Sequence, residues 1–481
     1  MSRDGSPQGC YSLPLMETVE RKPKRGEEVL VHVEGIDRKG KAVGVTDGHP
    51  IVINRGIPGD RVRARVTKRR KGALEGVSLE MLERGPGHVE ARCSHHVSCG
   101  GCKFQDLSYE VQLEILHGHI AKALRDAAVP FTEVDPVIAC AEPWNYRNKM
   151  ELSFGGIRWI EADEPEGAPR DFALGFHAPG RFDRVLDINE CHILFEGGIE
   201  IAETARSLAK ELQLTAWNPH THEGCLRHLI LRRGVRTQET LVYVVSSVRD
   251  DVVDEFLDRL SASPPEITTL VHGVNSHVAD VATSQERRVI KGPGWITEQL
   301  RGVEFRISPE SFFQTNTLQA ERLFEVVLEE AQIAEAGLVY DLYCGAGSIS
   351  LLLAAAAQRV VGFELSREAV SDAEANASRN EISNVSFVAG DLAETIGAVN
   401  ERPDVLICDP PRAGMHDRVV EKVIEIGPQR IVHVSCNVNT AAKELARFAY
   451  HGYELVRSRP VDLFPHTPHV ECVFTLERRR S

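Results

Sequence analysis

The 481-residue sequence has no long hydrophobic run, few cysteines for its length and no excess of positive charge. No apolar stretch approaches the roughly 18 residues that a membrane span requires, and the first 25 residues lack the hydrophobic segment of a signal peptide. Eleven cysteines are too few for a disulfide scaffold in a chain of this size. We therefore expect a cytoplasmic protein without a membrane partner, in which clustered cysteines indicate metal binding or catalysis.

The formal net charge of -14 argues at first sight against a nucleic-acid partner, because such partners are bound by neutralising their phosphates. The charge is unevenly distributed, however. A short stretch carries seven basic residues and no acidic one: Arg61, Arg63, Arg65, Lys68, Arg69, Arg70 and Lys71. The acidic remainder does not cancel this local field within a Debye length of about 10 Å. An RNA partner therefore remains possible.

The length allows about three domains, and the pattern of hydrophobic and polar residues changes at three places. Residues 1–25 show no periodicity and are expected to be disordered. Residues 26–85 contain five short strand patterns, which predict a small β-barrel of oligonucleotide-binding type. Alternation within 61–66 places the arginines on one face, which suits either solvent or RNA.

The remaining sequence divides into two further regions. Residues 86–310 begin with a cysteine-rich stretch and an amphipathic helical pattern over 107–124, and their strand-like segments predict a central α+β domain. Residues 311–481 alternate strands with helices, which indicates an α/β fold with a doubly wound parallel sheet.

Three strand ends in the last region carry features of a nucleoside-binding site. The glycine loop at 341–347 lies where a strand turns into a helix, so that Gly345 lets the backbone approach a ligand. Glu364 and Asp391 end the next two strands, where a ribose and an adenine edge would lie. Each acid taken alone is more often a helix N-cap or part of a solvated loop, but their common register at successive strand ends favours a binding site. The third glycine of a dinucleotide fingerprint is missing, so a single nucleoside cofactor fits better.

Two further strand ends carry residues suited to methyl transfer onto a pyrimidine. Asp409 opens an Asp-Pro-Pro-Arg motif, and Cys436 lies just before a predicted helix whose N-terminus should lower the pKa of the thiol. Glu471 begins the last predicted strand. Thiolate addition at C6 of uracil activates C5 toward a methyl donor, and a base must then remove the C5 proton. We assign these two roles to Cys436 and Glu471.

These motifs together resemble the RNA uracil-5-methyltransferases, specifically the longer members with an N-terminal TRAM domain and an iron–sulfur cluster. The resemblance covers roughly residues 28–477. It rests on the segments 311–316, 341–347, 409–412, 435–437 and 469–471. It implies a Rossmann-like class I methyltransferase domain that uses S-adenosylmethionine, with Cys436 as nucleophile and Glu471 as base. The residues implied to contact the cofactor are Gln314, Tyr343, Gly345, Glu364, Asp391 and Asp409.

A separate cysteine cluster has the spacing C-x5-C-x2-C, formed by Cys93, Cys99 and Cys102. A closed thiolate site needs a fourth ligand. The family resemblance points to Cys191 and to a four-iron, four-sulfur cluster, whereas spacing alone leaves zinc open. Because uracil methylation transfers no net electrons, we expect the cluster to be structural or to shape the surface that binds RNA.

Two other functions remain as alternatives. A cytosine-5 methyltransferase would use the same thiolate addition, but such enzymes place the nucleophile in a Pro-Cys or Thr-Cys context, which Cys436 lacks. A non-catalytic RNA-binding protein would not need the glycine loop together with Asp409, Cys436 and Glu471. The TRAM-plus-cluster architecture favours 23S ribosomal RNA as the substrate, with transfer RNA as the alternative, and we expect a monomer.

Overall fold

The computed structural model describes residues 21–161, 164–333, 337–399 and 401–479. The chain forms two compact units, one up to His88 and the other from Val89 onward. Most of the N-terminal segment predicted to be disordered, residues 1–20, lies outside the described residues. Among those that are described, no helix is both long and apolar enough to cross a membrane.

The first unit is a closed five-stranded barrel with the strand order β1-β2-β3-β5-β4. Its strands are β1 (Glu28–Ile36), β2 (Ala42–Thr46), β3 (His49–Ile53), β4 (Arg61–Arg69) and β5 (Leu74–Glu83). Alternate residues of β1 and β4 are buried, and they fill the interior with small branched side chains such as Val31, Val62 and Ala64. This confirms the predicted barrel, whose closure leaves no free sheet edge.

The outward face of β4 carries the predicted row of arginines, and each is paired with a carboxylate. Arg61 pairs with Glu83, Arg63 with Glu80 and Arg65 with Glu28 on the neighbouring strands. These pairs neutralise the part of the basic stretch that lies in the regular strand. The free positive charge of the barrel is therefore smaller than the sequence alone suggests.

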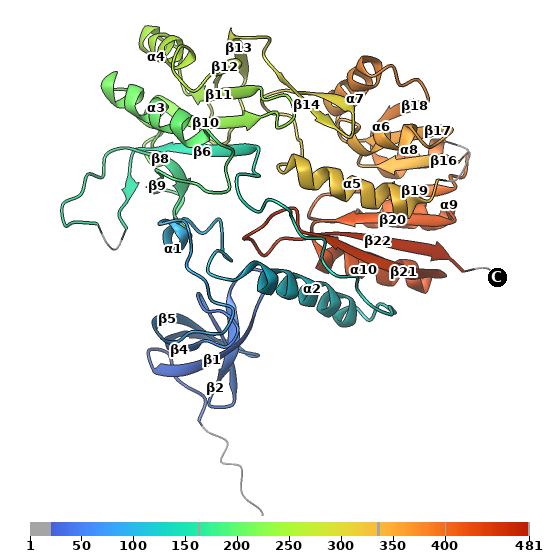
Figure 1. Ribbon diagram of the computed structural model, residues 1–481, viewed down its shortest axis with the longest axis horizontal. Coiled ribbons are helices and arrows are strands. Elements are labelled where there is room, and N and C mark those ends of the chain that lie inside the picture. Colours follow the sequence, from blue (N-terminus) through green and yellow to red (C-terminus); the bar gives the residue numbers. More distant parts are fainter. Residues whose placement is uncertain (1–20, 162–163, 334–336, 400, 480–481) are drawn as a thin grey trace, which may run out of the picture. The chain divides into compact units, whose positions relative to one another are not determined.

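The second unit begins with a loop-rich segment and a mixed eight-stranded sheet, ordered β13-β12-β11-β10-β6-β8-β9-β7 (Figure 1). The strands are β6 (Lys149–Gly155), β7 (Arg158–Trp159), β8 (Ala173–His177), β9 (Val185–Asp187), β10 (Leu226–Arg233), β11 (Thr240–Ser246), β12 (Thr269–Val274) and β13 (Glu286–Lys291). The helices are α1 (His96–Cys99), α2 (Tyr109–Asp126), α3 (Gly198–Glu211) and α4 (Asp251–Ser261). The amphipathic pattern over 107–124 thus forms α2, as predicted.

The C-terminal part is a seven-stranded sheet ordered β18-β17-β16-β19-β20-β22-β21, with helices on both faces (Figure 1). Its strands are β16 (Leu338–Leu342), β17 (Arg359–Glu364), β18 (Val385–Ala389), β19 (Val405–Cys408), β20 (Arg430–Ser435), β21 (Tyr453–Val461) and β22 (Glu471–Arg478). Its helices are α5 (Thr317–Ala331), α6 (Ser348–Ala354), α7 (Arg367–Arg379), α8 (Leu392–Ala398), α9 (Asp417–Ile426) and α10 (Val438–Tyr450). All residues of β19 are buried, as expected for a strand covered on both faces.

The strand order places a topological switch point at β16, because β16 lies between β17 and β19. Ligands of doubly wound sheets bind at such a point, beyond the carboxyl ends of the strands. Five of the strands run parallel, while β22 pairs antiparallel with both β20 and β21. The doubly wound fold predicted from the sequence is therefore confirmed, with an antiparallel hairpin at one edge.

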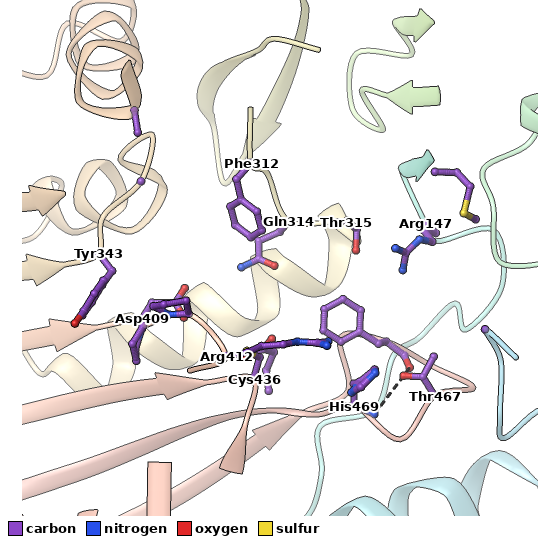
Figure 2. Close-up of a pocket in the computed structure, with 18 of the residues that line it drawn as sticks. Arg147, Phe312, Gln314, Thr315, Tyr343, Asp409, Arg412, Cys436, Thr467 and His469 are labelled. Carbon is purple, nitrogen blue, oxygen red and sulfur yellow. Dashed lines mark hydrogen bonds between the residues drawn. The ribbon is translucent and has the colours of Figure 1, made fainter. Parts of the chain in front are cut away.

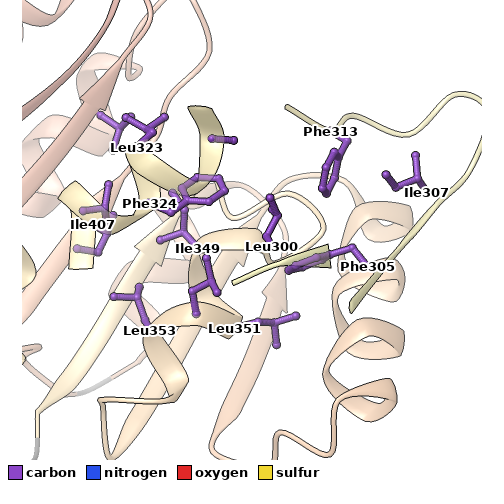
Figure 3. Close-up of a cluster of buried hydrophobic side chains, with 14 of the residues drawn as sticks. Leu300, Phe305, Ile307, Phe313, Leu323, Phe324, Ile349, Leu351, Leu353 and Ile407 are labelled. Atoms are coloured by element: carbon purple, nitrogen blue, oxygen red, sulfur yellow. The ribbon is translucent and has the colours of Figure 1, made fainter. Parts of the chain in front are cut away.

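One hydrophobic cluster connects this sheet to the central part of the chain (Figure 3). It joins α5 and α6 to the hairpin formed by β14 (Ile296–Leu300) and β15 (Val303–Ile307). Along β10, Ile230 faces this cluster, while Leu229 and Leu231 face a second core under α3 and α4. The shared core holds the two sheets together across the predicted boundary at residue 310.

Candidate active site

A single cavity of about 1200 Å³ lies beyond the carboxyl ends of the parallel strands (Figure 2). Its walls come from the glycine loop after β16, the loops after β17, β18, β19 and β20, and segments of the central domain. Of the twelve residues predicted from the sequence, all but Cys93 line this cavity: Gln314, Tyr343, Gly345, Glu364, Asp391, Asp409, Cys436, Glu471, Cys99, Cys102 and Cys191.

The glycine loop after β16 is held by the carboxylate that ends the next strand. Tyr343 and Gly345 have positive φ angles of 64° and 54°, and the Gly345 N–H donates to Oε2 of Glu364 at 3.1 Å. The other Glu364 oxygen accepts from the Ser366 N–H at 2.9 Å. A Cβ added to Gly345 would meet nothing within 4 Å, so the cavity is open above the loop.

A second acid lies beneath the glycine loop and was not predicted as part of the site. Asp341, at the end of β16, is fully buried and accepts a hydrogen bond from the Ser350 hydroxyl at 2.5 Å. Burial raises its pKa to about 7, and the nearby carboxylates of Asp409 and Glu364 add to the shift. Through its hydrogen bond with Ser350, the Asp341 side chain links the first turn of α6 to β16, the strand that carries the loop.

Asp391 is a helix N-cap and also lies at the cavity wall. Strand β18 ends two residues earlier, at Ala389, and Asp391 is the N-cap of α8, where its Oδ1 accepts from the Ala393 N–H at 2.8 Å. The same side chain lines the cavity. An N-cap and a ligand contact are compatible, because a carboxylate has further acceptor positions.

Gln314 is positioned by a residue of the central domain. The Asn148 amide donates to the Gln314 carbonyl at 3.0 Å and to the Thr317 hydroxyl at 2.9 Å. Thr317 in turn donates to the buried carboxylate of Glu298 at 2.7 Å. Asn148 and Glu298 were missed by sequence reasoning, because nothing in the local sequence indicates partners 166 and 19 residues away.

The register of the sheet brings Cys436 and Glu471 together. Strands β20 and β22 run antiparallel with Ser435 opposite Cys472. Cys436, which follows Ser435, and Glu471, which precedes Cys472, therefore lie opposite each other at the same edge of the sheet. Cys436 follows β20 and Glu471 begins β22. Figure 2 shows Cys436 in the same part of the cavity as Asp409 and Arg412. The predicted pair therefore lies at adjacent positions on one wall.

The surroundings of this pair favour the protonated form of both groups. Burial raises the pKa of Glu471 to about 8, with Asp409 adding to the shift and Arg412 opposing it. Burial, followed by the two carboxylates, raises the pKa of Cys436 to about 11. The lowered thiol pKa predicted from the start of α10 is therefore wrong, because burial and neighbouring negative charge outweigh the helix N-terminus.

The loop 462–470, which leads into Glu471, is held by residues from the N-terminal part of the second unit. His466 lies in the left-handed region at φ 68°, stacks on Trp144 with ring centroids 3.8 Å apart and is almost fully buried. Gln112 on α2 accepts from the His466 N–H at 3.0 Å, and its amide lies 3.2 Å from Nδ1 of the ring. The His466 carbonyl accepts from the Phe104 N–H at 3.0 Å.

Two tyrosines hold the same loop. Tyr109 donates to the buried Asp462 carboxylate at 2.7 Å, and Tyr146 donates to the Pro465 carbonyl at 3.1 Å. These contacts come from segments more than 300 residues earlier in the chain. The N-terminal part of the second unit therefore determines where Glu471 lies.

The predicted metal ligands come together in the structure. The charges of Cys93, Cys99 and Cys102 are close enough to interact with that of Cys191. Cys99, Cys102 and Cys191 line the cavity, whereas Cys93 does not. Within the described residues, however, no three His, Cys, Asp or Glu side chains are arranged to hold a metal ion.

Hydrogen bonds join the two segments that carry these cysteines. The backbone N–H and hydroxyl of Ser94 both donate to Glu190, at 2.5 and 2.6 Å. The ring of His95 lies 2.8 Å from Oδ1 of Asn189. The segment 187–191 is thus fixed beside 93–102 through side chains that flank the cysteines.

The fold and the position of the cavity define a methyltransferase of the doubly wound class. A family model described as tRNA (Uracil-5-)-methyltransferase matches residues 265–479, and a TRAM domain model matches residues 22–79. The chain belongs to the RNA uracil-5-methyltransferase family and carries a TRAM domain; it is an RNA (uracil-5-)-methyltransferase. The predicted family is confirmed, in preference to the cytosine-5 and non-catalytic alternatives.

Similar proteins span the whole chain. An uncharacterized RNA methyltransferase of Chlorobaculum tepidum is 38% identical over 479 residues, covering 96% of this chain and 99% of the relative. One from Caldanaerobacter subterraneus is 36% identical, covering 94% and 99%. The crystal structure of Pyrococcus abyssi tRNA (uracil-54, C5)-methyltransferase with S-adenosyl-L-homocysteine has a TM-score of 0.74 at 28% identity, covering 93% of this chain and 99% of that one.

Proposed function

We propose that this enzyme methylates C5 of a uridine in RNA, with Cys436 as the nucleophile and Glu471 as the base. The observation that carries the proposal is the pairing of β20 with β22, which places a thiol and a carboxyl group side by side at the cavity wall. The same cavity reaches the switch point of the sheet, so a cofactor and a base can occupy it together.

S-adenosylmethionine fits the end of the cavity at the switch point and supplies an electrophilic methyl group there. The loop at Gly345 leaves open space for a ligand, and Glu364 and Asp391 offer acceptors for hydroxyl and amino groups. Gln314, Tyr343 and Asp409 complete the set of residues proposed to hold the cofactor. The acidic character of this end suits a cofactor that carries a positive sulfonium.

The chain's own residues perform the remaining steps. The Cys436 thiolate adds to C6 of the uracil, and the electron pair moves to C5 and O4 as an enolate. When C5 has gained the methyl group, Glu471 takes the C5 proton, the C5–C6 double bond re-forms and the bond from C6 to sulfur breaks. Cys436 leaves as a thiolate. Cys436 must therefore lose its proton before the first step, and Glu471 must lose its proton before it takes the one from C5.

The substrate is proposed to be 23S ribosomal RNA, with transfer RNA as the second candidate. The TRAM match supports the longer architecture for which ribosomal RNA is expected from the sequence. The Pyrococcus neighbour acts, by its name, on uracil 54 of tRNA, which supports the alternative. One assay separates the two: transfer of labelled methyl to each unmodified RNA, followed by nucleoside analysis.

Label in 5-methyluridine supports the chemistry, and the RNA that carries it identifies the substrate. Label in 5-methylcytidine overturns the choice of base. Transfer to transfer RNA but not to ribosomal RNA, free or partly assembled, overturns the first substrate and supports the second. Absence of label from both, while the protein binds S-adenosylhomocysteine, overturns the proposed activity on these RNAs.

Cys93, Cys99, Cys102 and Cys191 are proposed to hold a four-iron, four-sulfur cluster with a structural role. Four thiols on two segments joined by hydrogen bonds suit such a group. Zinc fits less well. A zinc ion needs its thiolate ligands about 2.3 Å away from it, and the described side chains offer no group of ligands arranged around one ion in this way.

The test is the metal content of anaerobically purified protein, independent of activity. Iron and acid-labile sulfide in equal amounts are expected, with loss of both in Cys191→Ser and retention in Cys225→Ser, which alters a buried thiol outside the set. Zinc in place of iron, or full iron content in Cys191→Ser, overturns the assignment.

A further inference from the structure

The cavity is lined by both acidic and basic side chains. The carboxylates of Glu364, Asp391 and Asp409 are among them, as are the guanidinium groups of Arg147, Arg412 and Arg418. Figure 2 shows Arg147 and Arg412 entering the cavity from opposite sides, with His469 nearby. Uncharged side chains line the space around them: Met150, Phe176, Ile193, Phe312 and Phe464.

Arg147 is a half-buried cation that no carboxylate neutralises. It precedes β6, and its Nε donates to the Lys149 carbonyl at 3.1 Å, which fixes the side chain and leaves the terminal N–H groups toward the cavity. No carboxylate of the described chain lies within 4 Å of its guanidinium. A half-buried guanidinium is costly to leave without an acceptor, so this position suits an anionic ligand.

Arg412 is likewise unpaired, in the loop after β19. The Arg412 carbonyl accepts from the Asn437 amide at 2.9 Å, which ties this loop to the residue that follows Cys436. Its exposed guanidinium forms no ion pair with any carboxylate in the described part of the chain. Three arginines that line this cavity, Arg147, Arg412 and Arg418, form no ion pair within the described residues, in a protein of net charge -14. Of these, Arg147 and Arg412 are the two whose charges act on His469.

The charges of Arg147 and Arg412 both lower the pKa of His469, so both guanidinium groups lie near this histidine in the same part of the cavity. Burial, and then the charges of Arg412, Lys103 and Arg147, lower the pKa of His469 to about 4, so this ring is neutral at physiological pH. The positive field at this part of the cavity therefore comes from the arginines and the lysine. It lies beside Cys436 and Glu471, where the target base would be held.

We propose that Arg147 and Arg412 bind the phosphodiester groups on the two sides of the target uridine. The inference rests on the proposed function, because it takes the cavity to be the site of the base. An enzyme that acts on a base must turn the nucleotide out of its stack, and the strand on both sides must then be held against the rim. The planar fork of arginine matches a phosphate group with two parallel hydrogen bonds.

The experiment measures how tightly four proteins bind one oligoribonucleotide at several salt concentrations. The oligoribonucleotide contains, unmodified, the uridine that the wild type methylates. The four proteins are the wild type, Arg147→Gln, Arg412→Gln and the control Arg125→Gln, an exposed arginine on α2 that does not line the cavity. Each cavity variant should bind the RNA about tenfold more weakly. Each should also lower the slope of log affinity against log salt by roughly 0.7 to 0.9. Affinity for S-adenosylhomocysteine should be unchanged.

A second arm tests the phosphate contact itself. Methylphosphonate at a phosphate next to the uridine should weaken binding by the wild type, and should have no further effect on the variant that has lost its partner arginine. Unchanged affinity and salt slope in both cavity variants, or a loss as large in Arg125→Gln, overturns the inference. Lost S-adenosylhomocysteine affinity assigns the arginines to the cofactor and also overturns it. Failure of the proposed function appears separately, as a wild type that methylates no RNA.

Discussion

Replacing Gln112 by alanine should stall the reaction after methyl transfer, although Gln112 contacts no reacting atom. Its side chain is 1% exposed, and the amide donates to the carbonyls of Phe104 at 3.0 Å and Leu107 at 2.9 Å. It also holds both the backbone and the ring of His466. The NH2 group has two hydrogens and the oxygen accepts from His466, so three bonds form at a time; roughly 0.5 to 1.5 kcal/mol for each gives a loss of unfolding free energy of about 1.5 to 4.5 kcal/mol.

The effect on catalysis follows from the backbone at His466. A φ of 68° costs about 1 kcal/mol for a residue other than glycine, so the contacts of His466 help to hold the loop in this conformation. When the Gln112 contacts are lost, the loop is held only by Trp144, Phe104 and the two tyrosines, and Glu471 is positioned less precisely. Because Cys436 adds to C6 before Glu471 takes the C5 proton, the methylated RNA then remains bonded to Cys436.

The assay is a denaturing gel that detects protein covalently bound to labelled RNA, combined with denaturant unfolding. Gln319→Ala is the matched control, since Gln319 is buried on α5 and its amide donates to the Ile138 carbonyl at 3.2 Å. The control should lose stability without accumulating the adduct. If Gln112→Ala is destabilised to a similar degree and turns over normally, with no adduct, the positioning role is refuted.

Two further predictions follow from burial. The rate with bound RNA should rise at least about tenfold from pH 7 to pH 9, because Glu471 has a raised pKa of about 8 and acts only when deprotonated. Cys436, with its pKa near 11, adds up to about a hundredfold over the same range where thiolate formation limits the rate. A single-turnover rate that is flat or falls over this range contradicts the assignment. Leu323→Ala, at a fully buried position of α5, should lower the unfolding free energy by about 2 to 5 kcal/mol. The control Leu318→Ala alters a residue of the same helix that is 41% exposed, and it should change this free energy by about 0.5 kcal/mol or less. Equal losses in denaturant unfolding would refute this reading of the core.

Much of the fold was predictable, because hydrophobic periodicity is a local property of the sequence. The helix predicted over 107–124 forms as α2, and the last strand begins at Glu471 as expected. The alternation around Val62 correctly separated the interior of the barrel from its surface. In each case the side chains that decide the structure are neighbours in the sequence.

The parts that were missed depend on contacts between distant residues. Asn148 positions Gln314 from 166 residues away, and Gln112 holds His466 from 354 residues away. No local pattern indicates either pair. The pKa of Cys436 was predicted in the wrong direction for a similar reason: the helix start is visible in the sequence, but burial and the neighbouring carboxylates are not.

The most direct test of the central claim is to trap the covalent intermediate on RNA in which 5-fluorouridine replaces uridine. Fluorine at C5 cannot be removed as a proton, so the methylated base should stay bonded to the enzyme. The account predicts an adduct that requires S-adenosylmethionine, that maps by peptide mass spectrometry to Cys436, and that is absent in Cys436→Ala. An adduct on another of the eleven cysteines, or methyl transfer by Cys436→Ala to ordinary RNA, would contradict it.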